Sequence, residues 1–112
     1  MGVIRDKTRE DMKLSTEMVI VPKIQKYLAT QPVVRAWLFG SFSRGEETPT
    51  SDLDILFVPD KTQHFSLFTL GGMYSDLKEL LGREVDLVTY GSLKPFARNS
   101  VEQDKILIYE RK

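Results

Sequence analysis

The sequence predicts an α+β domain, in which a small mixed β-sheet is flanked by helices. Short runs rich in β-branched and aromatic residues indicate strands, and apolar residues spaced three or four apart indicate helices. Along the chain these segments alternate in the order α-β-β-α-β-α-β, which is typical of a sheet with helices packed on it. A chain of 112 residues suits one modest core, so we expect a single domain over 1–112.

The first helix and the first strand come from the N-terminal third of the chain. Residues 1–15 are polar and are expected to be flexible or a loose extension of the first helix. An apolar stripe follows over 16–30, but Pro22 interrupts it, so the helix should either kink or begin there. The run "VVRAWLF" (33–39), which ends at Gly40, predicts a strand.

The remaining elements follow from the same two signals. They are expected at 52–58 (strand, closed by Pro59), 67–81 (helix), 84–90 (strand), 92–103 (helix) and 105–110 (edge strand). Gly82 is a good C-terminal stop for the second helix, and Ser92 is a plausible N-cap for the third, with Pro95 in its first turn. Gly71 and Gly72 should weaken the second helix by about 1 kcal/mol each. Close packing of another backbone or of a ligand would explain them, and so would helix mobility.

Composition excludes several classes of protein. Lys+Arg and Asp+Glu both number 16, so there is no positive excess for general nucleic-acid or membrane-surface binding. The absence of cysteine excludes disulfides and thiolate metal sites. Apolar runs are too short to span a bilayer, and the charged N-terminus does not resemble a signal peptide. We therefore expect a cytoplasmic protein with no membrane association.

Three aspartates are placed where strand side chains can converge. Asp52 and Asp54 share one face of the second strand because successive strand side chains alternate. Asp86 repeats the pattern on the third strand, so the three carboxylates gather if these strands are neighbours. Crowded carboxylates repel one another, and hard divalent cations such as Mg²⁺ relieve this cost. Two such ions could stabilise both the attacking and the leaving oxygen of a phosphoryl displacement.

The turn before these aspartates could hold the phosphates. Gly40 lets a ligand approach its backbone, and Ser41 offers a hydroxyl and a backbone N–H group. Arg44 adds a positive charge, although a solvated turn residue is an equal alternative, and Ser51 could bind a phosphate or orient a carboxylate. A lone Asp-x-Asp or Gly-Ser is usually part of an ordinary turn, but the conjunction of all these motifs favours a phosphoryl-transfer site.

The stretch "LFGSFSRGEETPTSDLDILF" followed by "EVDLV" resembles the signature of the polymerase-beta-type nucleotidyltransferase superfamily. The short chain is similar to its minimal nucleotidyltransferases, the MNT family. The resemblance implies a polymerase-beta-like fold in which Asp52 and Asp54 bind two Mg²⁺ ions. Asp86 would be the third carboxylate, which helps to bind metal and accepts the proton of the attacking hydroxyl. Gly40 and Ser41 match positions that hold the nucleoside triphosphate, which we expect to be ATP.

The resemblance also implies a partner. MNT proteins are similar to antitoxins that act beside HEPN-type ribonucleases and transfer AMP to a tyrosine hydroxyl of that toxin, with loss of pyrophosphate. We therefore expect a hetero-oligomer with a HEPN-type toxin and no direct nucleic-acid binding. Two alternatives stay open. One is a small-molecule nucleotidyltransferase completed by a separate helical subunit, and the other is an antitoxin that acts by non-catalytic binding alone.

Other candidate residues have ordinary structural explanations. His64 is expected to be a solvated loop residue rather than part of a site. Trp37 and Phe39 could stack on a base, but strand aromatics are usually core residues. Tyr74 lies on the stripe of the second helix and is expected to pack, and the charged end "YERK" is expected to be solvated.

Overall fold

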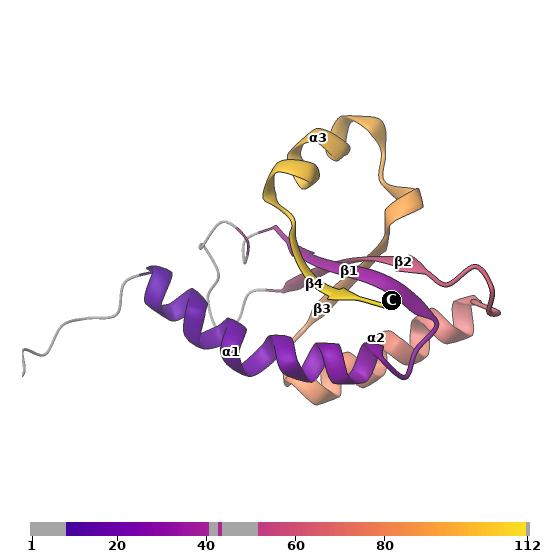
Figure 1. The fold of residues 1–112 in the computed structure, drawn as a ribbon, viewed down its shortest axis with the longest axis horizontal. Coiled ribbons are helices and arrows are strands. Elements are labelled where there is room, and N and C mark those ends of the chain that lie inside the picture. Colours follow the sequence, from indigo (N-terminus) through magenta and orange to yellow (C-terminus); the bar gives the residue numbers. More distant parts are fainter. Residues whose placement is uncertain (1–8, 41–42, 44–51, 112) are drawn as a thin grey trace, which may run out of the picture.

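The computed structural model describes residues 9–40, 43 and 52–111. Its elements, in chain order, are α1 (Arg9–Leu28), β1 (Val33–Phe39), β2 (Leu53–Pro59), α2 (Leu67–Leu81), β3 (Val85–Thr89), the 3₁₀ helix η1 (Tyr90–Ser92), α3 (Pro95–Asp104) and β4 (Ile106–Glu110). Helices α1 and α2 cover one face of the sheet, and α3 lies on the other side (Figure 1). This arrangement confirms the predicted class of a mixed sheet flanked by helices.

The four strands form one sheet in the order β3-β2-β1-β4. The β1–β2 and β1–β4 pairs are antiparallel, whereas β2 and β3 are parallel and are joined by the crossover through α2. A parallel pair needs such a long connection, and helix α2 supplies it. The predicted edge strand at the C-terminus is confirmed, because β4 borders only β1.

Helix α1 passes through Pro22 rather than starting there. The alternative that the helix begins at Pro22 is therefore wrong. Ile20, Ile24 and Leu28 form a buried stripe on both sides of the proline, and this packing offsets the loss of one backbone hydrogen bond. In the part of the chain that the structure describes, no helix has both the length and the apolar character of a membrane span.

Helix α2 has a defined cap at each end. Ser66 and Thr69 form a reciprocal capping box at its N-terminus. Gly82 ends it as predicted, with φ +66° and its N–H donating to the carbonyl of Lys78. A Cβ atom added at Gly71 or Gly72 would meet nothing within 4 Å, so close packing of another backbone does not explain these glycines.

The segment after β3 differs from the prediction at Ser92. Its hydroxyl donates to the carbonyl of Thr89 at 2.8 Å, so it closes the η1 turn instead of capping α3. Lys94 occupies the N-cap position of α3 and makes no side-chain cap bond there. Pro95 is the first residue of the helix, as predicted, because proline needs no hydrogen-bond partner for its nitrogen in the first turn.

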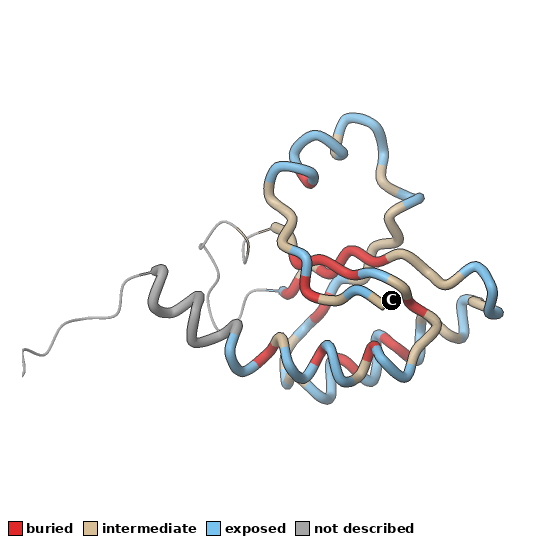
Figure 2. The backbone as a smooth tube through the Cα atoms, in the orientation of Figure 1, coloured by how far each residue is buried: buried red, intermediate tan, exposed pale blue. Residues whose placement is uncertain are grey.

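Buried residues form two clusters on opposite faces of the sheet (Figure 2). The larger cluster lies under α1 and α2, and its fully buried side chains include Ile24, Leu28, Leu38, Ile55, Phe57 and Leu77. The smaller cluster joins Trp37, Leu56 and Val101 on the α3 side, with Phe39 half-buried beside it. Trp37 is only 8% exposed, so its predicted core role is confirmed.

Arg111, from the C-terminal run "YERK", is not simply solvated. Its Nη2 donates to the carbonyl of Gln31 at 2.7 Å and to that of Leu28 at 3.2 Å, and its main-chain N–H donates to the carbonyl of Val34 at 2.9 Å. The expectation of a solvated end is wrong at this residue, because the last carbonyls of α1 need donors and the sequence does not show that Arg111 returns to them.

Candidate active site

The parallel register of β2 and β3 places Asp54 opposite Asp86. Residues paired across a parallel ladder point to the same face of the sheet, so both side chains lie on the α3 side, away from Ile55. Asp52 immediately precedes β2 and is two positions from Asp54. The prediction that these two strands are neighbours is confirmed, and the register accounts for how two distant segments bring their aspartates together.

The three carboxylates differ in exposure. Asp54 is half-buried, and Asp52 and Asp86 are exposed. Within residues 9–40, 43 and 52–111, no three acidic, histidine or cysteine side chains lie close enough to hold a metal ion together. Carboxylate oxygens on one face are the donor type that Mg²⁺ prefers, and exposure leaves room for water and phosphate as further ligands. The residue types therefore fit Mg²⁺, but the described side chains do not form a closed ligand set.

Gly40 lies against Asp54. It follows β1, has φ +73°, and a Cβ atom there would overlap Oδ2 of Asp54 and lie 3.0 Å from its Cγ. Phe39, the residue before it, pairs with Asp54 across the β1–β2 ladder. The sequence predicts that Gly40 leaves room for a ligand. In the structure, the group that approaches its backbone is the Asp54 carboxyl, and a side chain at position 40 would displace it.

Ser43 also belongs to this turn. Its hydroxyl donates to the carbonyl of Gly40 at 2.8 Å and so helps to hold the turn. Ser43 is not among the predicted site residues, although a serine three positions after a turn glycine is a recognisable local signal. Ser41, Arg44 and Ser51, the other predicted phosphate-binding residues, lie outside the described part of the chain.

A hollow of about 320 Å³ lies between α2 and β3, beside Asp86. Most of the residues that line it are apolar. The lining residues are Leu67, Leu70, Gly71, Tyr74, Val85, Asp86 and Leu87.

Tyr74 is 38% exposed and its hydroxyl donates to Oε2 of Glu84 at 2.8 Å, so the prediction that Tyr74 serves packing is wrong. This hydrogen bond raises the pKa of Tyr74 above its usual range. His64 is exposed, as predicted.

Comparison with known proteins shows which family this chain belongs to. The family described as "Polymerase beta, Nucleotidyltransferase" matches residues 22–112. The chain belongs to this family. As a nucleotidyltransferase, it has the predicted fold, and the paired Asp54 and Asp86 lie within the matched region.

Three known proteins are similar to this nucleotidyltransferase in sequence or in fold. A Methanocaldococcus jannaschii protein named "Putative protein adenylyltransferase" is 37% identical over 75% of this chain and 88% of its own length. A structure described as that of a putative minimal nucleotidyltransferase has a TM-score of 0.63 at 29% identity and covers 92% of this chain and 98% of that one. In fold alone, the chain is also similar to the structure of a tri-AMPylated Shewanella oneidensis HEPN toxin in complex with MNT antitoxin. That likeness has a TM-score of 0.64 at 21% identity, covering 85% of this chain and 73% of that one.

Proposed function

We propose that this nucleotidyltransferase transfers AMP from ATP to a tyrosine hydroxyl of a HEPN-type toxin ribonuclease and thereby acts as its antitoxin. The main support is the register that pairs Asp54 with Asp86 on one face of the sheet, in a chain 37% identical to a relative named as a protein adenylyltransferase. A complex of an MNT antitoxin with an AMP-modified HEPN toxin is among the structures of similar fold and supports the choice of acceptor.

The chain's own residues would perform the reaction in three roles. The backbone at Gly40, with Ser41, binds the triphosphate of ATP and directs its α-phosphate toward the aspartates. Asp52, Asp54 and Asp86 would supply oxygen ligands to two Mg²⁺ ions, with water and phosphate as further ligands, and these ions when bound neutralise charge on the phosphates. Arg44 and Ser51 are proposed as further phosphate contacts.

Bond making and breaking follow from this placement. The acceptor oxygen attacks the α-phosphorus, the bond from that phosphorus to the bridging oxygen of pyrophosphate breaks, and Asp86 takes the hydroxyl proton. Pyrophosphate leaves with the electron pair of the broken bond. Phosphoryl transfer of this kind depends on positioning and charge neutralisation more than on covalent help from the protein.

An open site favours a protein as the acceptor. Asp52 and Asp86 are both exposed, so an acceptor group can reach them from outside the domain. We therefore propose that residues 1–112 act as one domain and that the acceptor hydroxyl arrives on the partner, which makes a hetero-oligomer. Leu67 and Phe68, at the start of α2, are 84% and 93% exposed, as apolar residues at protein interfaces often are before assembly.

The decisive experiment is intact-mass analysis of the HEPN-type toxin after incubation with this protein and Mg·ATP. We expect mass increments of one or more AMP groups, and peptide mapping should locate them on tyrosine. The variant Asp54→Asn with Asp86→Asn should abolish the increments, whereas Glu79→Gln, an exposed change on α2, should retain them. An unmodified toxin in the presence of active enzyme would instead favour a small-molecule acceptor held by a separate helical subunit.

The same double variant separates catalysis from binding. If it no longer protects cells from the toxin, AMP transfer is the protective activity. If protection survives without any AMP increment, the protein neutralises its partner by contact alone, and the proposed mechanism is wrong.

A further inference from the structure

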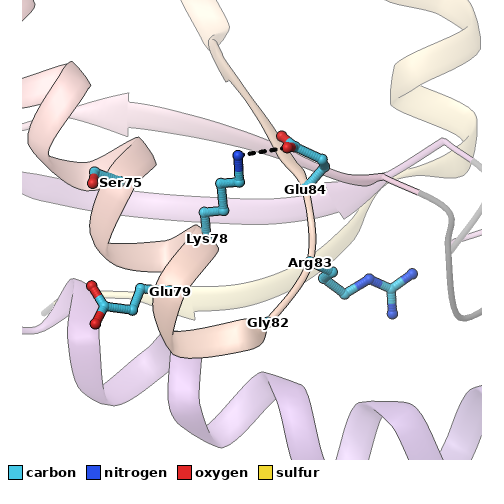
Figure 3. Close-up of a pocket in the computed structure, with 6 residues that line it drawn as sticks. All are labelled: Ser75, Lys78, Glu79, Gly82, Arg83 and Glu84. Atoms are coloured by element: carbon cyan, nitrogen blue, oxygen red, sulfur yellow. Dashed lines mark ion pairs between the residues drawn. The ribbon is translucent and has the colours of Figure 1, made fainter.

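Glu84 is held by two side chains of α2 at the point where β3 begins. The hydroxyl of Tyr74 donates to Oε2 of Glu84 at 2.8 Å, and Nζ of Lys78 lies 2.6 Å from Oε1. Figure 3 shows Lys78 reaching across from α2 to Glu84. Each carboxylate oxygen therefore has its own partner. We call Tyr74, Lys78 and Glu84 the α2 clamp.

The main chain of Glu84 contacts the other strand of the site. Its carbonyl accepts a hydrogen bond from the N–H of Leu53 at 3.0 Å. Leu53 lies between Asp52 and Asp54, and Glu84 lies two positions before Asp86. Glu84 is therefore bound to α2 through its side chain and to Leu53, between Asp52 and Asp54, through its backbone. A shift of Glu84 would move Asp86 relative to Asp54.

The clamp contributes little to stability by itself. The side chains of Lys78 and Glu84 are 47% and 50% exposed, and ion pairs of this exposure are screened by water and typically add little to stability. Its importance is geometric, because Mg²⁺ demands near-octahedral ligand placement and groups behind the ligands commonly set that placement. Tyr74 and Asp86 also both line the hollow between α2 and β3, so the clamp lies next to the β3 segment that carries Asp86.

We propose that Glu84, held by Tyr74 and Lys78, is a positioning residue that fixes Asp86 opposite Asp54 for catalysis. This inference rests on the proposed function for the nature of the reaction, but the structural coupling it describes can be measured separately. Residues behind metal ligands typically change metal affinity or activity by about 10- to 100-fold when removed.

The chain contains a matched control for the clamp. Tyr90 donates to Glu102, and Lys105 Nζ lies 2.8 Å from Oε2 of Glu102, so the same three residue types meet between η1 and α3. This second trio is outside the β2–β3 segment that carries the aspartates. Glu84→Ala and Glu102→Ala therefore remove the same chemical group from two similar settings.

The experiment compares these variants in AMP transfer to the toxin and in amide exchange. For Glu84→Ala, we expect the Mg²⁺ concentration that gives half the maximal rate to rise about tenfold. The Leu53 amide, followed by NMR hydrogen exchange, should lose protection in the same variant. Tyr74→Phe should show both changes in weaker form, Glu84→Gln should recover part of the loss because its amide oxygen still accepts from Tyr74, and Glu102→Ala should show neither.

Two results would overturn the inference. One is an unchanged Mg²⁺ dependence in Glu84→Ala, and the other is an equal change in Glu84→Ala and Glu102→Ala, which would indicate a general loss of stability. If the wild-type protein transfers no AMP, the proposed function fails by itself. Leu53 exchange and Mg²⁺ titration by calorimetry then still test the clamp.

Discussion

At the scale of single residues, Gly40 carries two separate constraints. Its φ of +73° lies in the left-handed region, and the Asp54 carboxyl occupies the space where a side chain would begin. The first constraint concerns the backbone of the turn, and the second concerns the position of a proposed catalytic group. A comparison with another glycine of the same conformation can separate them.

Gly40→Ala should lower both stability and activity. The left-handed conformation costs a non-glycine residue about 1–2 kcal/mol in the free energy of unfolding, and the overlap with Asp54 adds to this. AMP transfer should fall by at least about 100-fold, because displacement of a catalytic group by 1 Å can have that effect. Chemical denaturation and a transfer assay measure the two losses.

Gly82→Ala is the control for that substitution. Gly82 has φ +66°, but a Cβ atom there would meet nothing within 4 Å. It should lose a similar 1–2 kcal/mol from the backbone alone and keep most of its activity. Equal loss of activity in both variants would mean that the contact with Asp54 has no catalytic importance.

Residue-level prediction from sequence was strongest where it depended on local periodicity. Strand alternation placed Asp52 and Asp54 on one face, because a period of two holds wherever the strand is regular. Asp86 was expected to join them only if β2 and β3 are neighbours, and the structure supplies that pairing. The role of Gly40 was only half predicted, since contact with Asp54 depends on the β1–β2 register. The prediction that Tyr74 packs in the core was wrong, because helical spacing does not show which end of an apolar stripe reaches the sheet edge.

At the scale of elements, α2 depends on a few fully buried side chains. Leu77 is 0% exposed and packs in the larger cluster, whereas Leu80, on the same helix, is 42% exposed. Leu77→Ala should lower the free energy of unfolding by about 2–5 kcal/mol. Leu80→Ala should cost much less, and similar losses in urea denaturation would contradict the observed orientation of the helix.

Helix α3 contains a group with a pH-dependent contribution. Lys105 and Tyr90 bind the Glu102 carboxylate and hold its pKa below the usual range, with a weaker contribution from Arg98. A lowered pKa means that the stabilisation is present above the ordinary value of 4.5 and is lost as the pH falls below it. Glu102→Gln should therefore lower Tm at pH 7 but have a progressively smaller effect toward pH 3, as measured by calorimetry. A difference in Tm that stays constant over this range would contradict the assignment.

Sequence reasoning about elements succeeded for type and order and failed at some boundaries. Every strand and α-helix in the described part of the chain was predicted, because their apolar patterns are set by the faces they bury. For α1, the alternative of a start at Pro22 was wrong, since tertiary packing on both sides of the proline outweighs a local helix penalty. Ser92 resembled a cap because serine suits both N-caps and tight turns, and only the structure distinguishes them.

At the scale of the whole molecule, Arg111 joins three distant segments. Besides the end of α1 and strand β1, its Nη1 lies 3.7 Å from Oδ2 of Asp60, which follows β2. Arg111→Ala should cost about 1–3 kcal/mol, the usual effect of removing hydrogen bonds from a charged donor. Arg111→Lys should recover only part of this, because an ammonium group cannot span the same carbonyls. Arg98→Ala, an exposed change, should alter denaturation by less than about 0.5 kcal/mol.

The parallel pairing of β2 with β3 also has a consequence for biosynthesis. A nascent chain that has emerged only as far as β2 carries Asp52 and Asp54 but still lacks Asp86. Because β3 can dock only after the whole α2 crossover has been translated, the site assembles late and all at once. A ribosome-bound fragment that ends before β3 should therefore not transfer AMP from ATP, and premature termination at the same point should yield a product with no transferase activity.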